Sequence, residues 1–314
     1  MSRTTPTESV AEQVAVNKPT TPLWLSRLAI IVAGFLWSSS GLFGKLELFD
    51  SWPIEQRGLM LSFWRAGFAA LFLWPFVRRP HWRWELLPMG FCFAVMVVSF
   101  LSSMTWGTSA NAIWLQYTAP CWVLLISRYV FRETWEPGAW GLILPALVGV
   151  ALILFFEFRS LQGEWAILAV ISGLLSAISY ALVVLFLRRM REENPFWLVA
   201  VNQTLTALFL LPFILSWAIW PTTTQLLWLA LFGVLQMALP YLLFSWGLRN
   251  IASHEATILT LVEPFLVPVW AYLTVGEVPA IWTVAGAAVI VFGLTLRYVV
   301  ARRRSNRMTS LPHA

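Results

Sequence analysis

The stretch Glu255–Glu277, EATILTLVEPFLVPVWAYLTVGE, is long and apolar enough to cross a bilayer, yet it carries Glu263 near its middle, followed by Pro264. An ionisable side chain at that depth is costly, so it normally faces a cavity or a partner. Pro264 has no backbone N–H, and it therefore frees a carbonyl one turn earlier. The stretch predicts a membrane helix with a bend and a functional carboxyl group at its centre.

A second copy of this stretch lies 144 residues earlier, at Asn111–Glu133, NAIWLQYTAPCWVLLISRYVFRE. Three positions coincide at that offset: Ala112 with Ala256, Pro120 with Pro264, and Glu133 with Glu277. The chain therefore reads as two copies of one unit, with Pro120 and Pro264 as matched helix kinks.

Further matches follow in the same order at offsets of 137 to 144 residues. The segment ALFLWPF at 70–76 matches ALFLLPF at 207–213, Gly34 pairs with Gly173, and Gly149 pairs with Gly293. Chance similarity between apolar helices is the alternative, but ordered matches favour duplication. Each unit holds five apolar spans, and an odd number predicts an inverted-topology repeat.

Composition places the chain in the membrane. It is 59% hydrophobic and 11% charged, with a mean hydropathy of +0.73, whereas soluble domains have about 25% charged residues. The net charge of +6 comes from short basic clusters between apolar runs, which argues against a nucleic-acid partner. Cys92 and Cys121 lie inside apolar runs and predict no disulfide framework.

Ten spans of about 20 residues fit this pattern. They are expected at about 25–46, 58–77, two within 86–127, 138–156, 165–187, two within 194–248, 252–273 and 279–299. Breaks are expected near Gly107–Ala110 and at Pro221. The predicted parts are a disordered tail at 1–22, five-helix repeats at 23–160 and 161–300, and a basic tail at 301–314.

The basic residues test this count. Every Lys and Arg except Lys45, Arg57, Arg65 and Arg159 falls in one set of alternate loops or in a tail. Basic loops stay in the cytoplasm. The pattern predicts a multi-pass protein of the inner (plasma) membrane with both termini cytoplasmic.

The matched stretches YTAPCWVLLISRYVFRE and LVEPFLVPVWAYLTVGE resemble the signature of the drug/metabolite transporter superfamily, EamA branch. The resemblance covers about 25–300 and implies an all-α protein of ten helices in two inverted five-helix repeats, which exports small metabolites, often amino acids. Two positions depart from the pattern in the first copy: Ala119 replaces the mid-helix Glu, and Arg132 replaces the Gly before Glu133.

Small and polar residues mark the candidate substrate site. In the first span Trp37 and Ser38 lie between Gly34 and Gly41, where a cavity wall and a close-packed seam are equally good interpretations. Other candidates are hydroxyl, amide and aromatic side chains that can orient an amphiphile, or alternatively bond helix to helix. They are Ser99, Ser103, Asn111, Gln116, Tyr117, Ser176, Tyr180, Gln236 and Tyr241.

Two charged residues complete the candidate set. Arg65 lies well inside the second span and is expected either to pair structurally or to bind a substrate carboxylate. Glu263 either titrates and carries a proton, or is held ionised by a cation such as Arg65 and shapes the site. Glu133 and Glu277 precede helices and are interpreted as structural.

No enzyme motif, metal-ligand cluster or cofactor motif is present, and the three histidines lie in loops or the tail. We expect a transporter that exports neutral or aromatic amino acids, or similar small amphiphiles, by alternating access. The alternatives are a proton-coupled antiporter, and a non-transport membrane protein such as a receptor or an intramembrane enzyme. Lipid and a small-molecule substrate are the expected partners, and a homodimer is left open.

Overall fold

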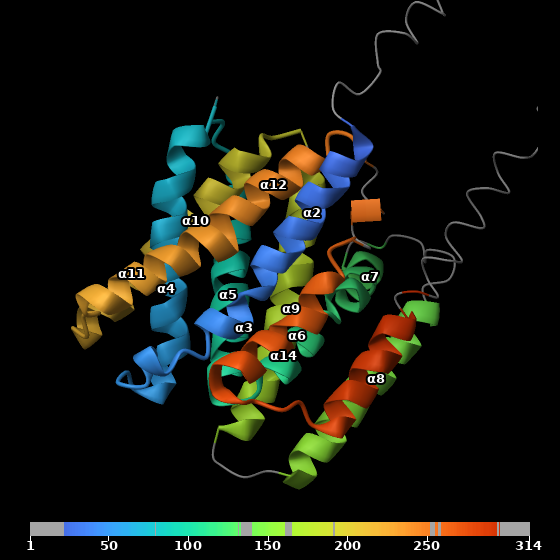
Figure 1. The fold of residues 1–314 in the computed structure, drawn as a ribbon. Coiled ribbons are helices and arrows are strands. Elements are labelled where there is room, and N and C mark those ends of the chain that lie inside the picture. The colour runs from blue at the N-terminus through green and yellow to red at the C-terminus, as the bar shows by residue number, and fades with distance from the viewer. Residues whose placement is uncertain are drawn as a thin grey trace, which may run out of the picture.

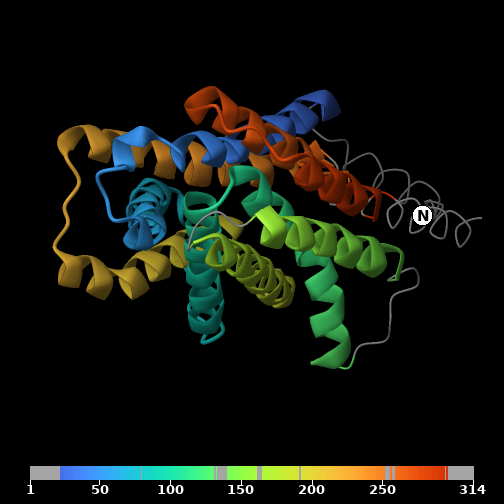
Figure 2. The same cartoon turned by 90° about the horizontal axis from the view of Figure 1, so that it is seen from below.

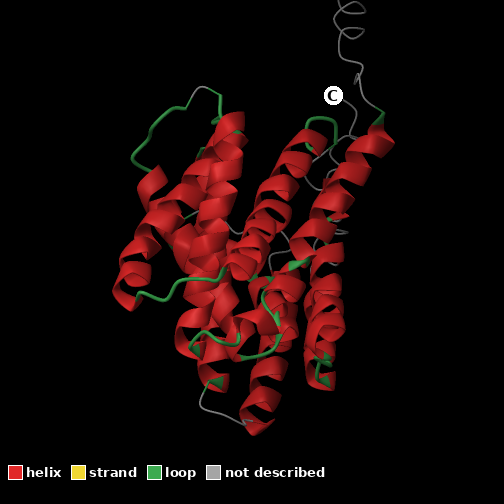
Figure 3. Cartoon of the chain, turned by 60° about the vertical axis from the view of Figure 1, so that its left-hand side comes forward, coloured by secondary structure: helices red, strands yellow, loops and turns green. Residues whose placement is uncertain are grey.

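The computed structural model describes residues 22–295 except 79, 131, 133–139, 161–164, 191, 252–254, 257–258 and 294. Both expected tails and Glu133 therefore lie outside the described residues, apart from Pro22. Every regular element in the described part is a helix (Figure 3).

Six described helical stretches are long and apolar enough to cross a membrane. They are α2 (Leu23–Ser38) with α3 (Ser40–Phe43); α4 (Ile54–Leu73) with η2 (Trp74–Phe76); α5 (Leu86–Trp106); α9 (Ala166–Arg189); α10 (Pro195–Trp217); and α11 (Thr223–Leu231), η3 (Phe232–Ala238) and α12 (Leu239–Gly247). The η3 segment is a π-helix inside its stretch. The predicted break at Pro221 is confirmed, because Thr222 caps the start of α11.

Further helices occupy the rest of the membrane sequence. They are α6 (Ser109–Gln116), α7 (Ala119–Tyr129), α8 (Trp140–Ser160), α14 (Val262–Val275) and the helix Ile281–Gly293. The expected break near Gly107 is confirmed, since α5 ends at Trp106 and Thr108 caps α6. A 3-10 turn, η1 (Glu47–Phe49), lies in the connection before α4.

The fourth and ninth predicted spans are interrupted at their matched prolines. Tyr117 and Thr118 form a turn between α6 and α7, and Pro120 sits in the first turn of α7. A turn also precedes α14, with Pro264 in its first turn. Proline costs little in a first turn, where its missing N–H has no helical acceptor. The two prolines thus mark helix restarts, whereas the sequence predicted bends.

The helices pack in matched pairs from the two halves. The α2 helix packs on α12 and α14, while α9 packs on α5, α6 and α7. A Cβ added to Gly34 would lie 2.8 Å from Val262, and one on Gly173 would lie 2.7 Å from Leu115. The first helix of each half thus closely approaches the interrupted helix of the other half. Figure 1 shows α3, α6 and α14 gathered in the centre of the bundle.

Figures 1 and 2 show α8 beside the helix Ile281–Gly293, at one edge of the bundle. These two helices meet at glycines, because a Cβ on Gly149 would lie 2.7 Å from the carbonyl oxygen of Gly286. The fifth and tenth predicted spans therefore pair with each other.

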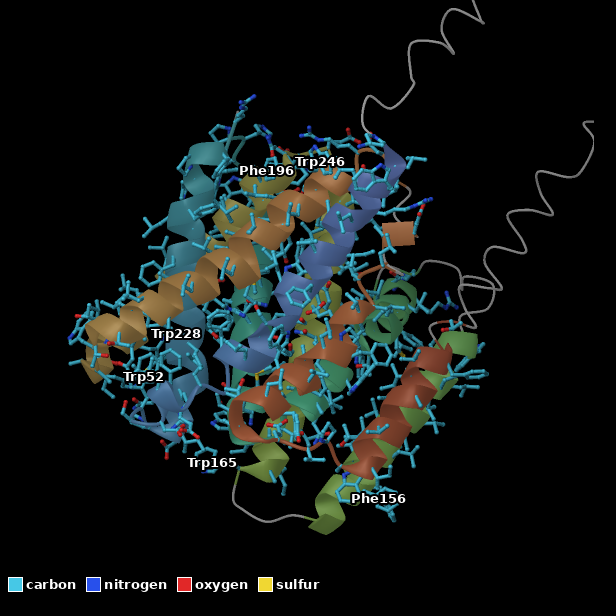
Figure 4. All side chains as sticks on the ribbon, viewed as in Figure 1. Trp52, Phe156, Trp165, Phe196, Trp228 and Trp246 are labelled. Atoms are coloured by element: carbon cyan, nitrogen blue, oxygen red, sulfur yellow. The ribbon has the colours of Figure 1, made fainter. Side chains whose placement is uncertain are left out.

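Ion pairs lie at both ends of the bundle. At one end Arg27 bonds Glu255 and Arg83 lies near Glu193, whereas the other end has Lys45 paired with Glu277. Figure 4 places Phe196 and Trp246 at the upper end and Trp52, Trp165 and Phe156 at the lower end. Aromatic residues at both ends are typical of membrane interfaces.

Candidate functional site

The two interrupted helices meet through one hydrogen bond. The Tyr117 hydroxyl donates to Oε2 of Glu263 over 2.9 Å. Tyr117 lies in the turn between α6 and α7, and Glu263 is the second residue of α14. Discontinuous helices at a repeat interface build the substrate sites of many transporters, because their unwound ends offer polar groups within the membrane.

Glu263 keeps part of its surface accessible, although it lies in the middle of the sequence stretch. No Lys, Arg or His of the described residues lies within ion-pair distance of it. One of the two alternatives from the sequence, an ion pair between Glu263 and Arg65, is therefore not seen. A carboxyl group at this depth needs a polar environment, and here the Tyr117 hydroxyl and the accessible side provide it.

Two further tyrosine side chains lie near this carboxyl group. Tyr180 of α9 and Tyr241 of α12 both interact electrostatically with Glu263, and Tyr180 keeps 40% of its surface accessible. The Trp37 ring meets Tyr241 edge-on, with centroids 5.2 Å apart. Helices of both halves thus contribute tyrosine or tryptophan around one acidic group.

A second polar group lies deeper, between α4 and the π-helical segment. Nη1 of Arg65 donates to Oε1 of Gln236 over 3.0 Å, and Nε2 of Gln236 donates to the Trp37 carbonyl over 3.3 Å. Arg65 is 1% exposed, and its guanidinium lies 5.0 Å from the centre of the Phe232 ring. Three of the predicted residues, Arg65, Gln236 and Trp37, are therefore connected.

The remaining predicted residues join helix to helix. Gln116 donates to Ser176 over 2.7 Å, and Ser176 donates to the Met96 carbonyl over 3.1 Å. Asn111 accepts from Thr283 over 2.7 Å, which joins α6 to the last helix. Ser99 is buried in α5, and Ser103 lies at the close approach of Gly173.

The small residues of the first predicted span also form a contact between helices. Ser38 donates to the Phe35 carbonyl and accepts from Nε1 of Trp270 over 2.9 Å. Gly41 leaves no room for a side chain, because a Cβ there would overlap the carbonyl oxygen of Val267. Of the two interpretations of this span, close packing describes Gly34, Ser38 and Gly41, while Trp37 belongs to the aromatic group.

Sequence reasoning counted Tyr117 among the polar candidates but did not predict its bond to Glu263. It also did not predict the bond of Trp270 to Ser38 or the pairing of Lys45 with Glu277. Tyr117 carried one signal, since it lies three residues before a repeated proline. In the searched, described residues no cluster of three metal-ligating side chains occurs. The site offers an acidic group, a guanidinium and aromatic rings, which suit reversible binding.

Comparison with known proteins identifies the same duplicated unit. The model of the EamA-like transporter family matches residues 24–155 and again residues 167–299. An uncharacterized transporter of Archaeoglobus fulgidus is 27% identical over 76% of this chain and 86% of its own length. The uncharacterized transporter YoaV of Bacillus subtilis is 23% identical over 88% of this chain and 98% of its own length. A riboflavin transporter of Rhizobium johnstonii is 28% identical over 46% of this chain and 51% of its own length.

A solved crystal structure has the same fold, with a TM-score of 0.60 at 17% identity over 88% of this chain and 98% of that chain. The family model covers nearly all of the predicted membrane part in two copies, and six described helical stretches are long and apolar enough to cross a membrane. This chain therefore belongs to the EamA-like transporter family of membrane proteins.

Proposed function

We propose that this protein exports small metabolites by alternating access, with substrate bound where the two interrupted helices meet. The hydrogen bond between Tyr117 and Glu263 carries this proposal. It joins the interrupted helices of the two halves, within the segments expected to lie in the membrane. A site at a repeat interface can face one side or the other as the halves rock around it.

Ten crossings in two inverted repeats are part of the proposal. The matched packing of α2 on α14 and of α9 on α6 supports it, as does a shared backbone feature. Gly276 ends α14 at a φ of 68°, and Arg132, 144 positions earlier, has a φ of 55°. Two halves that repeat a left-handed residue at matched positions fit one duplicated unit.

Most Lys and Arg residues fall in one set of alternate loops or in a tail. Because basic loops stay in the cytoplasm, this distribution supports cytoplasmic termini. A reporter enzyme that is active only outside the cytoplasm should be active when fused after Gly163 or Pro221, and silent when fused after Arg191. Equal signals at these three positions would contradict the ten-span arrangement.

The aromatic surroundings favour neutral or aromatic amino acids, or similar small amphiphiles, as substrates. Trp37, Tyr180 and Tyr241 offer flat apolar surfaces with polar edges, and Glu263 and Tyr117 offer polar contacts. A relative named a riboflavin transporter adds flat aromatic metabolites to the candidates.

An efflux screen tests the function. Cells that carry or lack the gene are loaded with amino acids, as dipeptides, and with riboflavin, and the medium is analysed over time. Faster export of one or more compounds only in gene-carrying cells is expected, and Tyr180→Ala should slow it. Identical export from both strains for every compound would contradict the proposal.

A proton-coupled antiporter is the second candidate, because Glu263 is an acidic group without an ion-pair partner among the described residues. Against it, the first span, 25–46, has no Asp or Glu, and small multidrug exchangers that resemble half of this chain rely on a carboxylate there. We favour a substrate-orienting Glu263, and the two candidates differ in their response to a pH gradient.

A further inference from the structure

Arg65 is a buried cation without a countercharge. No carboxylate of the described residues lies within ion-pair distance of its guanidinium. Among the described residues its guanidinium hydrogen-bonds only a neutral amide, that of Gln236, and its buried Nε has no hydrogen-bond partner there. The side chain is 1% exposed, so water does not complete its hydrogen bonds through an open surface.

The contacts that Arg65 makes do not offset the free-energy cost of burying its charge. The face of Phe232, 5.0 Å away, offers a cation–π contact, but such contacts are far weaker than the cost of removing an ion from water. Charges inside membrane proteins are usually paired with one another or placed on ion or substrate pathways. A countercharge that arrives with a ligand would account for this arginine.

The helix around Gln236 is shaped to hold the amide against Arg65. The chain is π-helical over Phe232–Ala238, and Pro240 has no N–H to bond the Gln236 carbonyl in an α-helical turn. Gly233 brings this segment against α4, since a Cβ there would lie 2.6 Å from the Arg65 carbonyl oxygen. Single π-helical turns are frequent at functional sites.

Hydrogen bonds and a ring contact link Arg65 to the aromatic residues near Glu263. Gln236 bonds the Trp37 backbone, the Trp37 ring meets Tyr241, and Tyr241 interacts electrostatically with both Arg65 and Glu263. Arg65 and Glu263 thus both lie near Tyr241.

We infer that Arg65, held by Gln236, is the oxyanion-recognising end of the substrate site, so that the molecules bound there carry a carboxylate or a phosphate group. The inference rests on the proposed function, and it states how a bound substrate is oriented in the site. The oxyanion binds the planar guanidinium through paired hydrogen bonds, the apolar body lies along Trp37 and Tyr241, and any ammonium group lies toward Glu263. Trp37 and Gln236 must shift to admit the oxyanion, because Arg65 is closed off in this structure.

Isosteric probes test this on the full-length protein in lipid nanodiscs. Indole-3-acetate carries a carboxylate, indole-3-acetamide has nearly the same shape without charge, and phenyl phosphate offers the other oxyanion. Equilibrium binding of each probe is measured by competition and by the shift in unfolding temperature. We expect indole-3-acetate, phenyl phosphate or both to bind about tenfold or more tightly than the amide, and the stronger of the two identifies the oxyanion.

Three variants separate recognition from folding. Arg65→Gln should lose the preference for the oxyanion, while Arg65→Lys should keep part of it because the charge stays but the planar fork is lost. Gln236→Glu places a carboxylate against Arg65 and should block the oxyanion probes about tenfold while raising the unfolding temperature. Arg57→Gln is the matched control on the same helix, since Arg57 already pairs with Asp50.

The inference would be overturned if neither indole-3-acetate nor phenyl phosphate bound the natural protein more tightly than the amide, or if oxyanion binding were unchanged in Gln236→Glu. Neither result depends on transport, so the efflux screen can succeed while this inference fails. Conversely, oxyanion binding that requires Arg65, without any efflux, would leave the inference standing and contradict the proposed function.

Discussion

Lys45 and Glu277 join the two halves of the chain at the end opposite Arg27. Nζ of Lys45 lies 2.9 Å from Oε2 of Glu277, and it also donates to the Gly107 carbonyl over 2.7 Å. Oε1 of Glu277 accepts from the backbone N–H of Ser109, the first residue of α6, over 2.6 Å. Glu277, which the sequence assigned to the helix that follows it, instead caps a helix of the other half.

Breaking this pair should destabilise the protein. Lys45→Glu should lower the free energy of unfolding by about 2 kcal/mol, because the side chains of Lys45 and Glu277 are only 16% and 12% exposed and the hydrogen bonds involve charged groups. The double variant Lys45→Glu, Glu277→Lys should recover only part of the loss, since a lysine cannot accept from Ser109.

The pair Arg27–Glu255 is the control, with side chains 50% and 33% exposed. Reversing its charge with Glu255→Lys should cost less than about 1 kcal/mol. Thermal unfolding in nanodiscs measures all three variants, and equal losses at the two ends would contradict the role of Lys45 and Glu277.

Arg132 and Gly276 provide a matched pair of backbone tests. Both have a positive φ, 55° and 68°, a conformation that costs an L-residue about 1–2 kcal/mol. Arg132→Gly should therefore raise the free energy of unfolding by about 1 kcal/mol, and Gly276→Ala should lower it by a similar amount. Apart from the adjoining chain, no atom of the described residues lies within 4 Å of a Cβ at Gly276, so backbone strain is the main effect there. A stabilising Gly276→Ala would contradict the shared conformation.

Periodic features of the chain were readable from the sequence because they depend on local chemistry. The apolar runs predicted the long helices, and Gly107 and Pro221 predicted two breaks that the structure confirms. The repeated Pro120 and Pro264 pointed to special places in two helices. In the structure the helix restarts at each of these prolines. At Pro120 the restart requires Tyr117 and Thr118 to leave the helix, and no residue type predicts this on its own.

The candidate site was predictable as a set of residues but not as a set of contacts. Glu263, Arg65 and Trp37 were identified by chemistry, yet the partner of Glu263 proved to be Tyr117 and the partner of Arg65 proved to be Gln236. These pairings span 146 and 171 positions. They depend on how distant helices cross, which periodicity within one helix does not encode.

Close packing of α3 on α14 predicts a sharp effect of one methyl group. Gly41→Ala would place its Cβ on the Val267 carbonyl oxygen, so we expect a loss of about 1–3 kcal/mol in the free energy of unfolding. Gly67→Ala on α4 is the control, because a Cβ there meets nothing within 4 Å and alanine favours a helix. If both variants unfold at the temperature of the natural protein, the two halves are less closely packed at Gly41 than the structure indicates.

The hydrogen bond between Tyr117 and Glu263 should matter for transport. Tyr117→Phe removes a donor to an acidic group, which is worth about 1.5–3 kcal/mol, and should slow downhill efflux about tenfold or more. Trp122→Phe is a control from the adjacent helix, because the hydrogen bond of its indole among the described residues goes to Thr118 and not to Glu263. Radiolabelled efflux from reconstituted vesicles measures both, and equal rates in the two variants would remove Tyr117 from the site.

Glu263→Gln separates a passive exporter from a proton-coupled one. Glutamine keeps the shape of the side chain and an oxygen that can accept from Tyr117, so a substrate-orienting Glu263 should leave much of the downhill efflux in vesicles intact. In that case an imposed pH gradient should not drive accumulation by the natural protein, because no titrating group links proton movement to substrate movement. A coupling carboxyl group behaves differently: the pH gradient drives uphill transport by the natural protein, and Glu263→Gln removes only that driven part while downhill exchange continues. Observing this second pattern would replace the passive mechanism with antiport and make Glu263 its proton carrier.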